Sequence, residues 1–240
     1  MKVIVTENYE EMSKKAAEVI ADVVKADENA VLGLATGTTP IGLYKELIAK
    51  CEKKELSFKN VKTVNLDEYV GLAKTHVQSY DYFMKDNLFN HIDIDIANTN
   101  LPSGVAENLD EECARYTALL NKMQQSVQLL GLGSNGHIGF NEPKTPFDST
   151  THIVSLTEST IKDNSRLFDN IDEVPTKAIT MGIANIMNAK KVLVVASGDN
   201  KAKAVYSMVK GPVTEDCPAS VLQNHADVVV IVDKKAAALL

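Results

Sequence analysis

Hydrophobic and polar residues follow two alternating patterns along the chain. Continuous apolar runs such as Val192–Ala196 and Val228–Val232 are typical of strands covered on both faces, as in a parallel sheet. Between such runs, apolar residues recur at helical spacing, for example Met12 and Ala16 within the stretch Asn8–Lys25. The alternation predicts a βα-repeating architecture.

The same patterns define the bounds of the expected elements. The predicted strands are Val3–Thr6, Ala30–Leu34, Val61–Leu66, Val127–Gly131, His152–Leu156, Ala178–Met181, Val192–Ala196 and Val228–Val232. The predicted helices are Asn8–Lys25, Pro40–Lys53, Ser79–Asn90, Glu107–Lys122, Glu158–Phe168 and Asn200–Lys210. Pro40 fits a first helical position with Thr38 and Thr39 as capping candidates, and Gly211 with Pro212 ends the last helix. We expect one α/β domain over residues 1–240.

Composition narrows the classes of partner. With 240 residues, 45% of them hydrophobic, the chain can bury a substantial core. A net charge of −7 disfavours nucleic acid and anionic membranes, although a few local cations can still bind a small anion. No apolar run has transmembrane or signal-peptide length, and the three cysteines Cys51, Cys113 and Cys217 form no disulfide or zinc pattern. These features predict a cytoplasmic protein with reduced thiols.

Parallel sheets bind ligands at the carboxyl ends of their strands, so the residues after each strand carry functional information. Ala30–Leu34 is followed by Ala35-Thr36-Gly37-Thr38-Thr39-Pro40 and then a helix. Gly37 allows inward-pointing amides, and the hydroxyls and helix N-terminus can share one space, which would form a phosphate cradle. A capped strand-to-helix turn fits the same residues equally well. No Gly-Lys-Ser/Thr follows, so the segment is not a Walker loop.

Two acids, Asp67 and Glu68, follow the strand Val61–Leu66. Neighbouring residues in extended chain point to opposite sides, so we expect only one of them to face a ligand. A partly desolvated carboxylate there is suited to removing a proton from a carbon next to a carbonyl. A solvated acidic turn or a helix cap is the alternative, and it is the commoner arrangement for acids considered alone.

A glycine-rich segment, Gly131–Pro143, follows the strand Val127–Gly131. Its start matches Gly-x-Gly-x-x-Gly, but no amphipathic helix begins at Gly136, so we reject a dinucleotide site. The segment instead presents His137, with Glu142 five residues later. Histidine can take and return a proton near neutral pH, and a neighbouring carboxylate can fix its tautomer. A hydrogen-bonded structural histidine is the alternative.

Two single cations complete the candidate chemistry. Arg166 lies late in a predicted helix, and Lys201 lies at the start of another, where its charge opposes the helix dipole. That small electrostatic cost is consistent with an anion bound nearby. Each cation taken alone also fits a solvated surface position.

Taken in order, these segments resemble the glucosamine-6-phosphate deaminase family over essentially the whole chain. The resemblance is carried by Leu34–Pro40, Asn65–Leu72, Gly136–Pro143 and Asn164–Arg166. It implies an α/β protein with a modified Rossmann-like three-layer fold, in which helices flank a central, mostly parallel sheet. It also implies the conversion of glucosamine 6-phosphate and water to fructose 6-phosphate and ammonia.

The resemblance assigns roles to single residues. Asp67 is implied to move the proton from C2 to C1, while His137 opens the sugar ring and Glu142 orients and polarises His137. The predicted phosphate-binding residues are Thr36, Gly37, Thr38, Thr39, Arg166 and Lys201. Asn135 stands where many family members have Asp, and it is included among the predicted catalytic residues.

The implied reaction needs no cofactor and no metal, and the five histidines are scattered without ligand spacing. Glucosamine 6-phosphate is the expected partner, and the protein is expected to be a monomer or a homo-oligomer. Shorter family members share Asn at position 135 and a similarly early C-terminal end. Both features argue against activation by an acetylated sugar phosphate, which is implied for the larger hexameric members, and the sequence alone leaves that activation open.

Two other functions remain open on the sequence. A 6-phosphogluconolactonase resembles the chain in its glycine-rich loop with histidine, but it needs no C2 base and so leaves Asp67 unused. A non-catalytic sugar-phosphate sensor is the second alternative, although a DNA-binding helix-turn-helix is expected in such regulators and the first predicted strand begins at Val3.

Overall fold

The computed structural model of the chain describes residues 1–157, 161, 165, 168, 170 and 173–240. Its strands are β1 (Lys2–Thr6), β2 (Val31–Leu34), β3 (Lys62–Asn65), β4 (Asp67–Tyr69), β5 (Thr99–Asn100), β6 (Val127–Gly131), β7 (His152–Ser155), β8 (Lys177–Thr180), β9 (Val192–Ala196) and β10 (Val228–Asp233). The predicted helix Glu158–Phe168, and Arg166 with it, falls largely outside the described residues.

The described α-helices are α1 (Tyr9–Ala26), α2 (Ile41–Glu52), α3 (Tyr80–Asn87), α4 (Leu109–Lys122), α6 (Ile183–Met187) and α7 (Ala202–Lys210). Short 3₁₀ turns η1 (Phe89–His91), η2 (Ile96–Asn98), η4 (Asp199–Lys201) and η5 (Pro218–Asn224) connect them. Every predicted strand corresponds to a strand within about one residue at each end, which is the usual uncertainty of element bounds.

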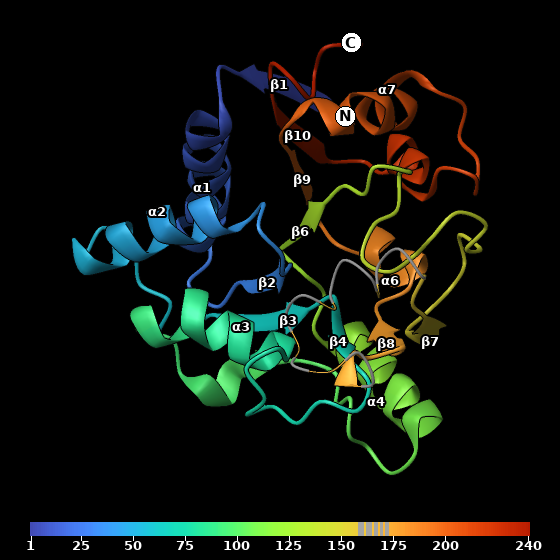
Figure 1. Cartoon of the computed structure of the whole chain (residues 1–240). Helices are drawn as coiled ribbons and strands as arrows, with labels where there is room; N and C mark the ends of the chain where they lie inside the picture. Colours follow the sequence, from blue (N-terminus) through green and yellow to red (C-terminus); the bar gives the residue numbers. More distant parts are fainter. Residues whose placement is uncertain (158–160, 162–164, 166–167, 169, 171–172) are drawn as a thin grey trace.

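The central sheet has seven strands in the order β1-β10-β9-β6-β2-β3-β5, and all of its pairs are parallel. Helices α1, α2 and α3 cover one face, whereas α4, α6 and α7 cover the other (Figure 1). The chain adds strands toward one edge of the sheet as far as β5 and then toward the other edge through β6, β9 and β10. Because crossovers between parallel strands are right-handed, this reversal of direction places the later helices on the opposite face. The predicted three-layer arrangement with a parallel sheet is confirmed.

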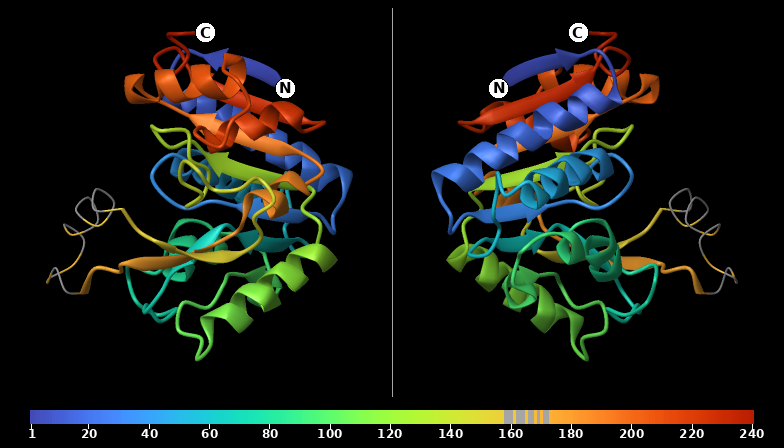
Figure 2. Two further views of the ribbon diagram at one scale, coloured as in Figure 1. Left: turned by 90° about the vertical axis from the view of Figure 1, so that its right-hand side faces the viewer. Right: turned by 90° about the vertical axis from the view of Figure 1, so that its left-hand side faces the viewer.

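A second sheet of three antiparallel strands, β4-β8-β7, was not predicted. It projects from the side of the central sheet (Figure 2). Its strand β7 is only partly covered, unlike the fully buried β9 and β10. The two shortest strands, β4 and β5, escaped prediction because two or three polar residues carry no periodic signal.

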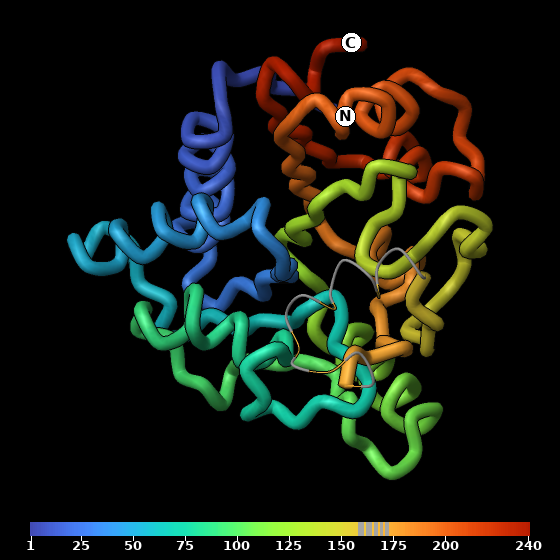
Figure 3. The backbone as a smooth tube through the Cα atoms, in the orientation of Figure 1, coloured from blue at the N-terminus to red at the C-terminus, as the bar shows by residue number. Residues whose placement is uncertain are grey.

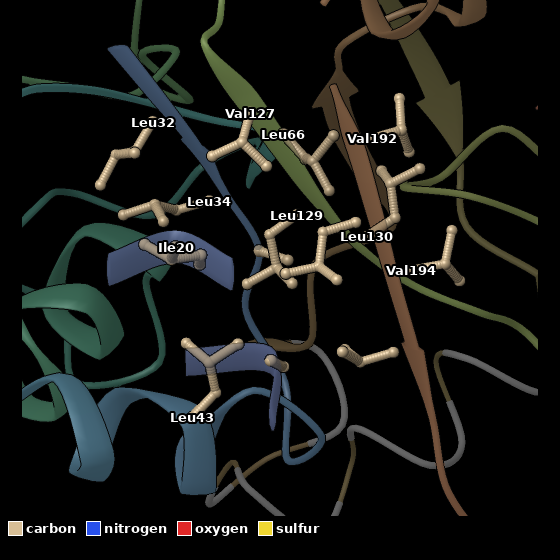
Figure 4. Close-up of a cluster of buried hydrophobic side chains, with 14 of the residues drawn as sticks. Ile20, Leu32, Leu34, Leu43, Leu66, Val127, Leu129, Leu130, Val192 and Val194 are labelled. Carbon is tan, nitrogen blue, oxygen red and sulfur yellow. The ribbon is translucent and has the colours of Figure 1, made fainter. Parts of the chain in front are cut away.

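The core fills the space between the central sheet and its helices. Ile20 of α1 and Leu43 of α2 pack toward Leu34 and Leu129 on the sheet, and each of these side chains is at most 1% exposed (Figure 4). Burial of such side chains contributes roughly 1.5–3 kcal/mol each. Both chain ends lie at the β1–β10 side of the molecule (Figure 3). Packing in this core fixes the positions of the strands of the central sheet, including their carboxyl ends.

Four neighbouring strands, β9, β6, β2 and β3, bring their carboxyl ends to one edge of the central sheet. The chain leaves β2 toward α2 on one face, and it leaves β6 toward the opposite face. The crevice between β2 and β6 is therefore the topological switch point, where open α/β sheets bind ligands. No helix in the described part of the chain is long and apolar enough to cross a membrane.

Candidate active site

A cavity of about 360 Å³ opens at this switch point. That volume suits a small metabolite. Its walls come from the segments after β2, β3, β6 and β9, and they include the predicted site residues Thr36, Gly37, Thr38, Thr39, Asp67, His137 and Lys201. Residues that lie far apart in the sequence thus converge on one cavity.

Asp67 begins β4, lines this cavity and is only 6% exposed. Burial, with a smaller contribution from the adjacent charge of Glu68, raises the pKa of Asp67 from 3.8 to about 8. Oδ2 of Asp67 lies close to the glycine-rich loop, because a side chain at Gly139 would place its first carbon 3.6 Å away. A carboxylate with this proton affinity is a competent general base near neutral pH.

Replacing Asp67 by Asn is expected to stabilise the fold increasingly as pH rises. The folded protein holds the Asp67 proton more tightly than the unfolded chain, so wild-type stability falls between pH 3.8 and about 8. Asn does not titrate. The difference in unfolding free energy should grow by about 3 kcal/mol between roughly pH 5.5 and pH 8, measured by urea denaturation. A pH-independent difference would contradict the assigned proton affinity.

Glu68 points away from the cavity, as the alternation along the chain predicts. Its carboxylate accepts the N–H groups of Tyr69 at 2.8 Å, Tyr80 at 2.9 Å and Asp81 at 3.0 Å. Two of these amides belong to the first turn of α3, so Glu68 joins that helix to β4. The alternative of a solvated acidic turn is wrong, because Asp67 and Glu68 are both buried.

The glycine-rich segment forms a loop held by hydrogen bonds, and no helix begins at Gly136, as expected from the sequence. The fully buried Asn141 donates through Nδ2 to the carbonyls of Ile138 and Met181, each at 2.9 Å. The N–H of Phe140 donates to Oγ1 of Thr180 at 3.1 Å. Thr180 of β8 pairs with Asp67 of β4. Thr180 therefore contacts both the glycine-rich loop and the residue that is the candidate base.

His137, Asn135 and Glu142 form a hydrogen-bonded group. Nδ1 of His137 lies 2.8 Å from Oδ1 of Asn135 and 3.2 Å from Oε1 of Glu142. Nδ2 of Asn135 donates to Oε2 of Glu142 at 2.7 Å, which fixes the direction of the amide. Both neighbours of Nδ1 are acceptor oxygens, so the neutral ring carries its proton on Nδ1, and Nε2 keeps its lone pair.

This group places Asn135 and Glu142 behind His137 and outside the cavity lining. The hydrogen bond from His137 lowers the pKa of Glu142, against the opposing effect of partial burial, so Glu142 is a carboxylate at neutral pH. Asn135 contributes orientation without charge. The carboxylate influence on the ring therefore comes from Glu142, as expected from the sequence.

Thr38 and Thr39 do not cap α2, so that prediction is wrong. The N-cap residue of α2 is Pro40, and no side chain supplies a cap hydrogen bond there. The two threonines instead lie in the cavity wall, after Gly37, whose φ of +94° is a left-handed conformation that favours glycine. A loop with its hydroxyls, and no side-chain cap of α2, thus stands where the sequence predicts a phosphate cradle.

Lys201 lines the cavity from the turn that precedes α7. Partial burial lowers the pKa of its ammonium group, and none of the ion pairs among the described residues includes it. Asp233 holds the preceding turn by accepting the Ser197 hydroxyl at 2.6 Å and the Gly198 N–H at 3.1 Å. A half-buried, uncompensated cation is an attractive position for an anion.

Tyr80 is a cavity residue that sequence reasoning missed. Burial, with smaller contributions from Tyr69 and Asp67, raises the pKa of Tyr80 well above its ordinary value, so its hydroxyl stays protonated. The ring lies parallel to that of Phe140, with centroids 6.4 Å apart. Nothing in a single sequence distinguishes this tyrosine from an ordinary residue in the first turn of a helix. Among the described residues, no group of three or more His, Cys, Asp or Glu could hold a metal ion.

Comparison with known proteins places this geometry in context. The family described as glucosamine-6-phosphate isomerases/6-phosphogluconolactonase matches residues 6–231. A glucosamine-6-phosphate deaminase of Clostridium perfringens is 56% identical over 241 residues, with all of both chains covered. A solved monomeric glucosamine-6-phosphate deaminase is 48% identical and superposes with a TM-score of 0.96 over 100% of both chains.

A more distant solved structure is the 6-phosphogluconolactonase from Leishmania guyanensis. It is 21% identical to this chain and superposes with a TM-score of 0.75 over 98% of this chain and 97% of that chain. At this level of identity the comparison establishes a common fold only. The matched residues and the nearer relatives together show that the chain belongs to the family of glucosamine-6-phosphate isomerases and 6-phosphogluconolactonases.

Proposed function

We propose that this protein converts glucosamine 6-phosphate and water to fructose 6-phosphate and ammonia. The observation that carries the proposal is the single cavity that Asp67, His137 and the Thr38–Thr39 loop share. A base for enolisation, an imidazole for ring opening and a phosphate grip are the three things that the reaction requires. The identity of 56% to a glucosamine-6-phosphate deaminase supports the same conclusion.

Phosphate binding positions the sugar. The hydroxyls of Thr38 and Thr39 and the ammonium group of Lys201 line the part of the cavity formed after β2 and β9. We propose that they hold the phosphate, together with Arg166, which lies outside the described residues. Because the phosphate is remote from C1 and C2, its binding energy can hold the open chain in a reactive pose.

Ring opening is proposed for His137. With its proton on Nδ1, the ring can accept the C1 hydroxyl proton at Nε2 and return it to the ring oxygen as the C1–O5 bond breaks. The carboxylate of Glu142, 3.2 Å from Nδ1, stabilises the imidazolium that forms between these two transfers. The product of this step is the open-chain aldehyde.

Enolisation is proposed for Asp67. Its carboxylate removes the proton from C2, the electron pair forms the C1–C2 double bond, and the carbonyl oxygen becomes a hydroxyl by taking up a proton from solvent, which is balanced by the proton that the substrate's ammonium group releases. Asp67 then returns its proton to C1, and the nitrogen lone pair forms a C2 iminium group. Water adds at C2 and ammonia leaves, which gives fructose 6-phosphate. The net reaction is an isomerisation coupled to hydrolysis of a carbon–nitrogen bond.

The proposal is tested by measuring ammonia release from glucosamine 6-phosphate, with and without an acetylated sugar phosphate. We expect steady ammonia release that the acetylated compound leaves unchanged. Turnover of 6-phosphogluconolactone without ammonia release would favour a lactonase, and tight binding of the sugar phosphate without turnover would favour a sensor. Either of these outcomes would contradict the proposal.

Three further features stay predictions. The charge and cysteine pattern supports a cytoplasmic protein, and residues 1–240 are proposed to fold as one domain. A relative that is 48% identical is described as monomeric, which supports the monomer among the two predicted states. Sedimentation velocity at micromolar concentration distinguishes a monomer of 26.1 kDa from an oligomer.

A further inference from the structure

Two tyrosine hydroxyls hold the loop after β2 from behind. Tyr44 of α2 is fully buried, and its hydroxyl donates to the carbonyl of Ala35 at 2.5 Å, where the loop begins. Tyr9, the first residue of α1, reaches the other end of the loop. Its hydroxyl lies 3.2 Å from the carbonyl oxygen of Thr38 and 3.1 Å from that of Thr39. Every residue between these anchors lines the candidate active site.

The Tyr9 hydroxyl also accepts the N–H of Gly42 at 2.8 Å. Gly42 is the second residue of α2, so its N–H has no acceptor within the helix. Position 42 requires glycine, because a methyl group there would overlap the Ser13 hydroxyl and lie 3.0 Å from the Tyr9 ring. The close approach of α1 and α2 at Gly42 is what lets the Tyr9 hydroxyl join both helices to the loop.

Tyr9 lies outside the active-site cavity. It lines a separate cavity of about 650 Å³ on the other side of the loop, and Thr38 and Thr39 belong to both linings. The first amides of α2 are already used, since the Ile41 N–H donates to the Thr38 carbonyl at 3.4 Å and the Gly42 N–H donates to Tyr9. The donors that the loop itself can offer an anion at this end are the threonine hydroxyls and the loop's own N–H groups, and their placement depends on how the Thr38 and Thr39 carbonyls are held.

We propose that Tyr9 is a positioning residue for phosphate recognition, acting through its hydrogen bonds to the Thr38 and Thr39 carbonyls and the Gly42 amide. One hydroxyl fixes the loop's last two carbonyls against the start of α2. Without the Tyr9 hydroxyl, the loop keeps its hydrogen bond from Tyr44 at Ala35 but loses the contacts that hold the Thr38 and Thr39 carbonyls. The identity of the phosphate-bearing substrate rests on the proposed function, whereas the hydrogen bonds do not.

The test is Tyr9→Phe, which removes the hydroxyl and keeps the ring. We expect the KM for glucosamine 6-phosphate and the dissociation constant of inorganic phosphate, measured by calorimetry, to rise together by about 5- to 10-fold. We expect kcat to stay within about twofold, because no group at the reacting carbons changes. Tyr206→Phe, at a tyrosine that is 47% exposed on α7, is the matched control and should change neither constant.

Thermal unfolding of both variants separates positioning from general destabilisation. Gly42→Ala provides a second variant, because the methyl group pushes α1 and its Tyr9 hydroxyl away from α2. It should show the same rise in KM and in the phosphate dissociation constant. Unchanged phosphate affinity in Tyr9→Phe, or equal losses in kcat and affinity, would overturn the proposal. A wild type that binds phosphate but releases no ammonia would overturn the proposed function alone.

Discussion

Replacing Asp67 by Asn is expected to abolish exchange of the C2 proton of the bound sugar with solvent, while phosphate affinity stays within about twofold. Asn has the size of Asp but cannot accept a proton at C2. Positioned general bases contribute about 10²- to 10⁴-fold, so kcat for ammonia release should fall by at least that range. Exchange is measured by NMR in deuterated buffer, and phosphate affinity is measured by calorimetry.

Asp22→Asn is the matched control, because Asp22 lies exposed on α1, away from the cavity. It should retain wild-type exchange and turnover. Wild-type exchange in the Asp67→Asn variant would remove Asp67 from the mechanism. Loss of phosphate affinity together with exchange would instead assign Asp67 to the shape of the cavity.

The wild-type protein should also report this base in its pH profile. Asp67 works as a base only when it is ionised, and its pKa is raised to about 8 by burial and by Glu68. The acidic limb of kcat/KM, which reflects the free enzyme, should therefore rise with pH up to about that value. A solvated aspartate base would instead place this limb near its ordinary pKa of 3.8, so the position of the limb tests the same assignment.

Replacing His137 by Gln is expected to slow ring opening and to spare the later steps. Gln can still hydrogen-bond within the group formed with Asn135 and Glu142, but it cannot carry a proton from the C1 hydroxyl to the ring oxygen. Turnover of glucosamine 6-phosphate should fall by about 10²- to 10⁴-fold. Ammonia release measured under saturating substrate provides the value of kcat.

An analogue of the substrate without its C4 and C5 hydroxyls separates ring opening from enolisation, because it can form neither the five-membered nor the six-membered ring. The His137→Gln variant should turn over this analogue at a rate close to that of the wild type. His91→Gln, at an exposed histidine in η1, is a control for the loss of imidazole as such. Normal turnover of the cyclic sugar by His137→Gln would refute the assigned role.

The central sheet could be predicted from the sequence because buried parallel strands leave a direct signal. Runs such as Val192–Ala196 have no polar position, and only a strand covered on both faces requires that. The side sheet left a weaker signal, because β4 is short and β7 is partly exposed, and the edge strand β5 of the central sheet is short as well. Which strands pair in an antiparallel manner depends on contacts that the local sequence does not encode.

The candidate site was predicted in part for a similar reason. Asp67 and His137 carry chemistry that stands out at strand ends, and the topology of a parallel sheet brings strand ends together. Tyr80 and Tyr9 could not be found in this way, because their proposed roles depend on the groups that their hydroxyls contact in the folded protein. The residue type alone does not indicate those contacts. The capping role expected for Thr38 and Thr39 failed because hydroxyls in a turn can face either the helix or the cavity. Propensity does not decide between the two.

The central claim is that one sugar contacts the base, the imidazole and the phosphate loop together. A crystal structure of the Asp67→Asn variant with glucosamine 6-phosphate tests it most directly. We predict the phosphate beside Thr38, Thr39 and Lys201, C2 next to residue 67, and the ring oxygen within hydrogen-bonding distance of His137. A phosphate bound elsewhere, or a sugar that reaches only one of residues 67 and 137, would contradict the account.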